Sequence, residues 1–151
     1  MKKIKAGFLL VLLLGILFSV QVGAESPNKI LINGTLADIP EDMGSMKVYA
    51  DRTFVPVRFV LEYFKYDVSW DEKDRIVFGR NEAGNVFVMQ VGSPYLTARE
   101  GNKKPENIIM DVEPFIVAEE GRTYVPIRFL AQAIGYKVGY DDFTGTVTLE
   151  K

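Results

Sequence analysis

Cysteine and histidine are both absent from the 151 residues of this chain. Without cysteine the protein forms no disulfide, so its stability has to come from a packed core. Without histidine, catalysis by a serine or cysteine nucleophile with a histidine base is excluded, and zinc or copper sites lose their commonest ligands. A paired-carboxylate hydrolase stays open, because glycoside cleavage needs only two acids at a suitable separation. We expect no catalytic residue, no metal and no cofactor.

Residues 1–24 are predicted to be a targeting segment. They contain a start with three lysines, an apolar run over Phe8–Val20, and small residues before a cut ahead of Glu25. This is the three-part pattern of a secretory signal peptide. A retained membrane anchor is the competing interpretation, and lipid attachment at a cysteine is excluded. We therefore expect a protein that is secreted or held at the cell surface, with residues 25–151 as a single domain.

The predicted mature chain also has no excess of basic over acidic residues. Removal of the three signal lysines leaves 15 of the 18 basic residues against 20 acidic ones, a net charge of about −5. Nucleic acids and anionic membranes select basic surfaces. We therefore expect neither nucleic acid nor, after signal removal, membrane as a partner.

The most informative feature of the chain is an eight-residue stretch that occurs twice. Arg52-Thr-Phe-Val-Pro-Val-Arg-Phe59 recurs as Arg122-Thr-Tyr-Val-Pro-Ile-Arg-Phe129, with six identical positions. The match extends downstream at the same spacing, where the corresponding pairs are Tyr66 and Tyr136, Val68 and Val138, Trp70 and Tyr140, and Asp71 and Asp141. Two copies are too few for a solenoid. We interpret the chain as one domain built from a duplicated unit, with copy one over about 29–79 and copy two over about 95–150.

Each copy predicts a strand, a short helix and a hairpin. Pro56 and Pro126 suit the first position of a helix, where the missing N–H costs nothing. An apolar stripe with helical spacing follows each proline and should face the core. The two stripes are Val57, Val60, Leu61 and Phe64 in copy one and Ile127, Leu130, Ala131 and Ile134 in copy two. Gly135 stands where a left-handed cap is wanted, but Lys65 holds that place in copy one, so we expect the first helix to end less sharply.

Strands are also predicted outside the helices, from short β-rich runs. They are residues 30–32 before Asn33-Gly34, 47–50, 52–55, 66–70, 75–78, 86–91, 95–98, 108–110, 115–117, 137–140 and 146–149. Residues 35–46 and 99–107 are expected to be loops. The predicted fold class is α+β: a mainly antiparallel β-sheet wrapped around two short helices, built from a duplicated β-α-β-β unit with one shared core.

The repeated unit resembles the copper amine oxidase-like N-terminal domain family, also called stalk domains, which is common in secreted proteins of Gram-positive bacteria. The matching residues are Arg52–Asp71 and, more closely, Met110–Leu149, including Asp111, Pro114, Arg122–Phe129, Gly135 and Asp141. The resemblance implies an antiparallel sheet curled around helix, in a module that is an accessory part of the oxidase. It does not imply oxidase activity, which belongs to a separate catalytic domain with copper-binding histidines and a tyrosine-derived quinone. The chain departs from the family pattern at Lys65, Gln132 and Tyr140, where the family has Gly, Glu and Trp, and at the start of copy one.

Four arginines are candidate binding residues because the repeat makes Arg52 equivalent to Arg122 and Arg58 equivalent to Arg128. The functional interpretation is a pair of anion-binding points, for example for acidic wall polymers. The alternative, which we favour, is that each arginine pins helix to sheet through a carboxylate or carbonyls and covers apolar surface with its stem. Glu62, one helical turn after Arg58, is a partner for that residue.

Trp70 and Tyr140 complete the set of six candidate binding residues. Together with Tyr66 and Tyr136 they would form a sugar-stacking platform if the rings point outward. A valine lies between the two aromatics of each strand on the same face, which favours the alternative that the rings pack in the core. The acidic turn Asp71–Asp74 suggests calcium, but an aspartate in a turn usually bonds its own backbone, and we favour that interpretation.

These patterns predict a non-catalytic secreted accessory or stalk module that mediates binding or spacing at the bacterial cell envelope. The alternatives are a carbohydrate-binding module for cell-wall polymers and, less favoured, a small extracellular hydrolase that acts through carboxylates. The expected partners are cell-wall polysaccharide or another envelope protein.

Overall fold

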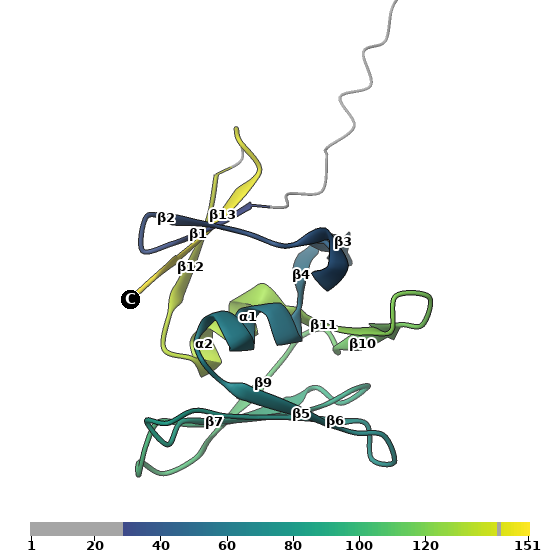
Figure 1. Ribbon diagram of the computed structural model, residues 1–151, viewed down its shortest axis with the longest axis vertical. Coiled ribbons are helices and arrows are strands. Elements are labelled where there is room, and N and C mark those ends of the chain that lie inside the picture. The colour runs from purple at the N-terminus through teal and green to yellow at the C-terminus, as the bar shows by residue number, and fades with distance from the viewer. Residues whose placement is uncertain (1–28, 142) are drawn as a thin grey trace, which may run out of the picture.

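The computed structural model describes residues 29–141 and 143–151 (Figure 1). The predicted signal peptide, residues 1–24, lies outside the described residues. Within the part that is described, no helix has the length and apolar character needed to cross a membrane. Secretion and location at the envelope therefore stay predictions.

The described residues form short strands interrupted by two short α-helices. In chain order the elements are β1 (Lys29–Ile32), β2 (Thr35–Asp38), the 3-10 helix η1 (Glu41–Met43), β3 (Lys47–Tyr49), β4 (Arg52–Pro56), α1 (Val57–Tyr63), β5 (Asp67–Asp71), β6 (Ile76–Arg80), β7 (Val86–Gln90), β8 (Tyr95–Arg99), β9 (Glu106–Ile109), β10 (Phe115–Val117), β11 (Arg122–Pro126), α2 (Ile127–Ala133), β12 (Lys137–Asp141) and β13 (Thr146–Glu150).

The strands form three sheets, with the orders β12-β13-β1-β2, β10-β11-β4-β3 and β5-β6-β7-β8-β9. Within the described residues every pairing is antiparallel except that of β1 with β13. Both helices lie between the sheet that contains β1 and the five-stranded sheet, with the sheet of β4 and β11 beside them (Figure 1). The α+β class with mainly antiparallel strands is therefore confirmed.

The two predicted copies correspond element by element. Strand β4, helix α1 and strands β5 and β6 have the same lengths as β11, α2, β12 and β13, at a constant spacing along the chain. The first strands of the two sets, β4 and β11, pair with each other, but the two hairpins lie in different sheets. A duplication explains this correspondence and stays an interpretation.

Each helix begins one residue later than its proline predicts. Pro56 and Pro126 are the residues before the helices, in extended conformation with φ and ψ of −60° and 116° and of −61° and 123°. Proline has a fixed φ that is compatible with an extended segment as well as with a helix. The two prolines therefore end strands β4 and β11, and the helices begin at Val57 and Ile127.

The expected difference between the helix ends is wrong. Lys65 adopts a left-handed φ of 61° and Gly135 a φ of 80°. After α1, Tyr66 N donates to Leu61 O at 2.9 Å, and the corresponding bond after α2 is 2.8 Å long. Both helices therefore end in the same Schellman motif, which satisfies carbonyls of the last turn. The chain tolerates a left-handed lysine, at a cost of roughly 1 kcal/mol, where the other copy has glycine.

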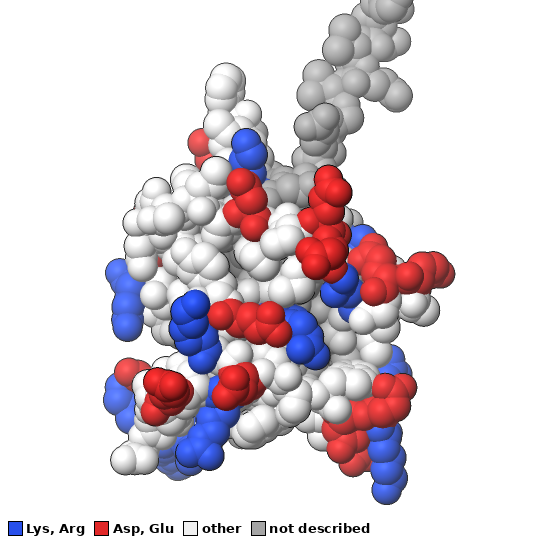
Figure 2. All heavy atoms as spheres, viewed as in Figure 1, with Lys and Arg blue, Asp and Glu red and all other residues white. Residues whose placement is uncertain are grey.

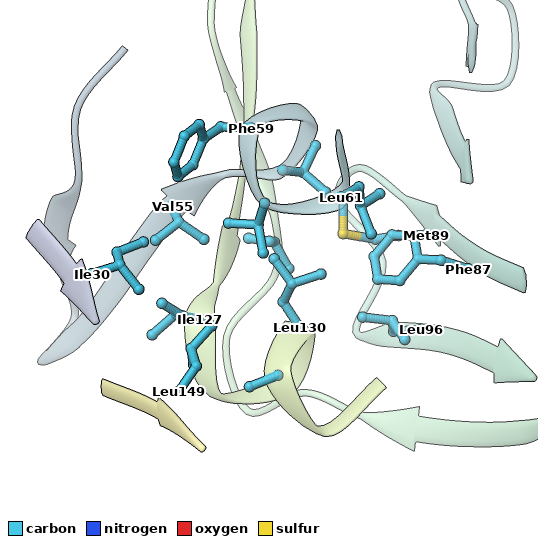
Figure 3. Close-up of a cluster of buried hydrophobic side chains, with 14 of the residues drawn as sticks. Ile30, Val55, Phe59, Leu61, Phe87, Met89, Leu96, Ile127, Leu130 and Leu149 are labelled. Atoms are coloured by element: carbon cyan, nitrogen blue, oxygen red, sulfur yellow. The ribbon is translucent and has the colours of Figure 1, made fainter. Parts of the chain in front are cut away.

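The predicted helix stripes face one common core. Val57, Val60 and Leu61 are buried in α1, and so are Ile127, Leu130 and Ala131 in α2. Phe64 and Ile134, just past the helix ends, are half-buried and pack against the same core. The core also contains side chains from all three sheets, and Figure 3 shows members such as Ile30, Phe87 and Leu149 around the helices.

Two predicted loops contain strands. Asn33 and Gly34 have φ of 48° and 77°, as in a two-residue hairpin turn, so the chain returns directly as β2 within the predicted loop 35–46. Only one of the four residues of β2 is buried, so the alternation of apolar and polar residues that predicts a half-buried strand is absent there. Strand β9 likewise begins inside the predicted loop 99–107.

Candidate functional site

The six candidate binding residues lie in two clefts, three in each. Cleft one, of about 310 Å³, is lined by Arg58, Trp70 and Arg122. Cleft two, of about 400 Å³, is lined by the equivalent residues Arg128, Tyr140 and Arg52. Each cleft thus combines a helix arginine and a strand aromatic from one copy with a strand arginine from the other copy.

The rest of the lining repeats as well. Every residue that lines cleft two, except Val147, has its counterpart from the repeat in cleft one. In cleft two these are Val48, Asp51, Arg52, Thr53, Pro126, Ile127, Arg128, Val138, Gly139 and Tyr140. In cleft one they are Ala118, Gly121, Arg122, Thr123, Pro56, Val57, Arg58, Val68, Ser69 and Trp70. The cause is the antiparallel pairing of β4 with β11, which places the start of each strand beside the helix that follows the other.

In cleft one, the helix arginine and the aromatic ring each have a carboxylate partner. Arg58 Nη1 donates to Glu62 Oε1 at 3.3 Å along the helix. Trp70 Nε1 donates to Glu72 Oε2 at 2.5 Å, which places a carboxylate on the cleft wall. The predicted pairing of Arg58 with Glu62 is therefore present. It joins two residues of α1 and does not pin the helix to a sheet.

In cleft two, the strand arginine is the one with a carboxylate partner. Arg52 Nη2 and Nε donate to Asp111 Oδ2 at 2.5 and 3.1 Å, and Arg52 Nη1 donates to the carbonyl of Asp51 at 3.1 Å. These bonds hold the start of β4 against the segment before β10. The hydrogen bond from Arg52 lowers the pKa of Asp111, and the nearby charge of Arg128 acts in the same direction.

Each cleft keeps one arginine without a salt bridge. Neither Arg122 in cleft one nor Arg128 in cleft two forms a salt bridge with a carboxylate of residues 29–141 or 143–151. For Arg128 the sequence explains this, because Gln132 stands one turn later, where copy one has Glu62. A neutral amide at that position cannot form the ion pair that the carboxylate forms.

The aromatic residues are less buried than their pattern predicts. Tyr66 is 6 % exposed and lies in the core, and Trp70 and Tyr136 are half-buried. Tyr140 is 51 % exposed, so the expectation that it packs in the core is wrong. Edge position does not explain the difference, because the strands that carry Trp70 and Tyr140, β5 and β12, are both edge strands. Trp70 packs against the buried core, whereas Tyr140 is not among the side chains that do.

The acidic turns bind their own backbone. Asp71 Oδ1 accepts a hydrogen bond from Asp74 N at 2.9 Å. Asp141 Oδ1 accepts from the backbone N of Phe143 and Thr144 at 2.9 and 3.2 Å, and its hydrogen bonds with Thr144 lower its pKa. Among the described residues no group of three or more acidic, His or Cys side chains is placed to hold a metal ion. Together with the lack of histidine in the sequence, this donor set does not fit a copper site.

Sequence reasoning missed two kinds of residue in the clefts. Thr53 and Thr123 line them beside the candidate arginines, and their identity in both copies was a usable signal. The acids Glu72 and Asp51 also line the clefts, one in each. The repeat was a usable signal for Glu72, because copy two also has an acid, Asp142, at that position, but not for Asp51, whose counterpart is Gly121.

A cluster of polar groups outside the clefts was also missed. Lys47 Nζ lies 2.6 Å from Glu120 Oε1 and 5.0 Å from the centroid of the Tyr124 ring, and the Tyr124 hydroxyl donates to Glu120 Oε2. The hydrogen bond from Lys47 lowers the pKa of Glu120, with the Tyr124 hydroxyl acting in the same direction. The signal was the tyrosine itself, since copy one has phenylalanine there and a buried phenol needs a partner.

Comparison with protein families gives a match over most of the chain. The family model described as the copper amine oxidase N-terminal domain matches residues 31–149, a range that includes both clefts. Neither the curated proteins nor the solved structures gave a significant match. The resemblance that the repeated unit suggested is thus confirmed.

Proposed function

Since this chain belongs to the copper amine oxidase N-terminal domain family, we propose that it is a non-catalytic accessory module that acts by binding at the bacterial cell envelope. In copper amine oxidases this domain is a non-catalytic part of the enzyme. A chain without histidine also lacks the commonest ligand of copper and the usual base of a nucleophilic triad.

A location outside the cytoplasm is supported by the sequence of residues 1–24. Their lysine-rich start, apolar run and small residues are those of a signal peptide. The absence of cysteine from the chain is compatible with this location, because the large shared core replaces disulfides as the source of stability. The ligand is therefore sought among the polymers of the envelope.

The observation that carries a binding role is the pair of equivalent clefts. On the face seen in Figure 2 acidic and basic side chains are interspersed, so attraction by a broad field of one sign is not the basis of recognition there. Local recognition remains, and the clefts supply it: an aromatic surface and guanidinium donors converge in each. A module that only spaces its neighbours would need no such convergence.

The test is co-sedimentation of the protein with purified bacterial cell-wall sacculi. We expect the wild-type protein to sediment with the walls and a Trp70→Ala/Tyr140→Ala variant to remain in solution. Phe143→Ala is the matched control, because Phe143 is an aromatic residue that is 98 % exposed and lines neither cleft. Circular dichroism checks that each variant is folded.

Two outcomes would contradict the proposal. If the wild-type protein does not sediment, it does not bind the wall, and a spacing or protein-protein role replaces binding. If the double variant sediments as the wild type does, binding takes place outside the clefts.

A further inference from the structure

The two clefts differ in which arginine is engaged, but each has one that is not. In cleft one Arg58 is paired with Glu62, and Arg122 has no salt bridge to a described carboxylate. In cleft two Arg52 is paired with Asp111, and Arg128 is the unpaired residue among those that the structure describes. Copy one therefore supplies the paired arginine of each cleft, and copy two supplies the unpaired one.

An unpaired guanidinium on a cleft wall has a defined chemical preference. Its planar array of N–H donors matches the two oxygens of a carboxylate or phosphate, and such charge-assisted bonds are about twice as strong as neutral ones. The aromatic residue of the same cleft offers a flat apolar surface to the ring of a sugar. The two features together fit a sugar ring that carries an acidic group.

The carboxylates in the clefts restrict this preference further. Glu72 in cleft one and Asp51 in cleft two are acceptors for the hydroxyl groups of a sugar. They also oppose dense negative charge, because like charges repel at short range. A ligand with one acidic group per cleft is favoured over a polyanion such as a nucleic acid.

We infer that each cleft binds one acidic sugar of a glycan, with Arg122 or Arg128 binding its carboxylate or phosphate and Trp70 or Tyr140 covering its ring. This assignment rests on the proposed binding function and names its ligand class. The helix arginines then have different tasks. Arg58 forms a salt bridge with Glu62, whereas Arg128 has a glutamine one turn later and forms no salt bridge with a described residue, although the carboxylate of Asp111 lies near enough for their charges to interact.

The first experiment compares ligands on the full chain by isothermal titration calorimetry. The probes are an oligogalacturonate, its fully methyl-esterified neutral form, and an oligosaccharide that carries mannose 6-phosphate. We expect an acidic probe to bind about tenfold more tightly than the neutral one, the effect of one hydrogen bond to a charged group. Preference for the first or the third probe tells a carboxylate from a phosphate as the natural acidic group.

The second experiment uses the difference between the copies. Arg122→Gln should weaken binding of the preferred acidic probe about tenfold in cleft one, and Arg128→Gln should do the same in cleft two. Both variants should leave binding of the neutral probe unchanged. Gln132→Glu should weaken acidic binding in cleft two up to about twofold without changing a cleft residue, because the new carboxylate pairs with Arg128 along the helix. Glu62→Gln is the reciprocal variant: it releases Arg58 and should strengthen acidic binding in cleft one.

The results separate this inference from the proposed function. If the neutral and acidic probes bind equally well, and the arginine variants bind as the wild type does, the acidic ligand class is wrong while binding at the clefts stands. If no probe binds but wall sacculi still retain the protein through Trp70 and Tyr140, the ligand class is again wrong. If the sacculi do not retain the protein either, both the inference and the proposed function are wrong.

Discussion

Val55 and Val125, which hold the same place in the two copies, lie opposite each other in the antiparallel pair of β4 and β11. The register on either side is symmetric, since Phe54 faces Pro126 and Pro56 faces Tyr124. Both valines are fully buried at the middle of the shared core. This pairing joins the copies, and it is the reason that each cleft takes residues from both.

The residues that end the two helices, Lys65 and Gly135, occupy the same position of the repeat and give a prediction about stability. Lys65 has a left-handed φ of 61°, which glycine adopts without the steric cost of a Cβ. Lys65→Gly should therefore stabilise the protein by up to about 1 kcal/mol in urea denaturation. Gly135→Ala is the reciprocal variant and should destabilise by about 1 kcal/mol, because a Cβ there meets nothing within 4 Å and the cost is conformational only. If Lys65→Gly instead destabilises the protein, the contacts of the lysine side chain contribute more to stability than its left-handed backbone costs.

The shared core gives a second prediction. Leu130 is fully buried, and Figure 3 shows it in one cluster with Leu61 of α1 and Phe87 and Leu96 of the five-stranded sheet. Leu130→Ala removes that packing and should lower the free energy of unfolding by about 2–5 kcal/mol. Leu36→Ala is the control, since Leu36 is 48 % exposed on β2 and its loss should change stability by about 0.5 kcal/mol or less. Similar effects of both variants on the urea midpoint would contradict the single core.

The helices, their buried faces and the fold class could be predicted because local patterns determine them. The stripe that begins at Val57 recurs at Ile127, and each follows a proline that ends a strand. The conformational preference of a single residue failed as a guide where hydrogen bonds and packing around that residue contribute more free energy. Lys65 adopts the left-handed cap because the hydrogen bonds of the last turn and the burial of Tyr66 outweigh a strain of roughly 1 kcal/mol.

The six candidate residues could be named from the sequence, but their grouping could not. Arg52 lies in the same cleft as Arg128 and Tyr140 only because β4 pairs with β11, and nothing local in the sequence specifies that pairing. The exposure of Tyr140 was missed for a similar reason. Trp70 and Tyr140 have the same local pattern, and both lie on edge strands. Packing against the core decides how far each ring is covered, and Trp70 makes that contact whereas Tyr140 does not.

The pair of Arg52 and Asp111 predicts a pH dependence of stability. The hydrogen bond from Arg52 lowers the pKa of Asp111 in the folded protein below the unfolded value of about 3.9. The contribution of this pair is therefore present above the unfolded pKa and is lost as the pH falls through the folded pKa. We expect Asp111→Asn to lower the urea midpoint at pH 6 and to reduce its fall between pH 6 and pH 3.

The control for this pair is Asp38→Asn, because Asp38 forms no salt bridge or side-chain hydrogen bond with the residues that the structure describes. Its urea midpoint should follow that of the wild type across the same pH range. If Asp111→Asn has the wild-type pH profile, the short contact with Arg52 does not stabilise the fold. Other acids whose pKa is lowered in the folded protein, such as Glu120 and Asp141, would then account for the loss of stability in acid.

The close approach of Gly44 to Tyr124 gives the last prediction. Gly44 has φ of 94°, and a Cβ there would lie 2.6 Å from the Tyr124 hydroxyl oxygen, so Gly44→Ala should destabilise by about 2 kcal/mol or more. Tyr124→Phe removes that oxygen, so the cost of Gly44→Ala should be smaller in this background, with a coupling of about 0.5–3 kcal/mol in a double-mutant cycle. Gly34→Ala is the control, because Gly34 also has a positive φ but a Cβ there meets nothing within 4 Å. Its cost should be the same in both backgrounds. Equal costs of Gly44→Ala in both would mean that the Tyr124 hydroxyl is not what requires the glycine, and that backbone strain and the approach to Arg122 Cδ, at 3.0 Å, account for the cost.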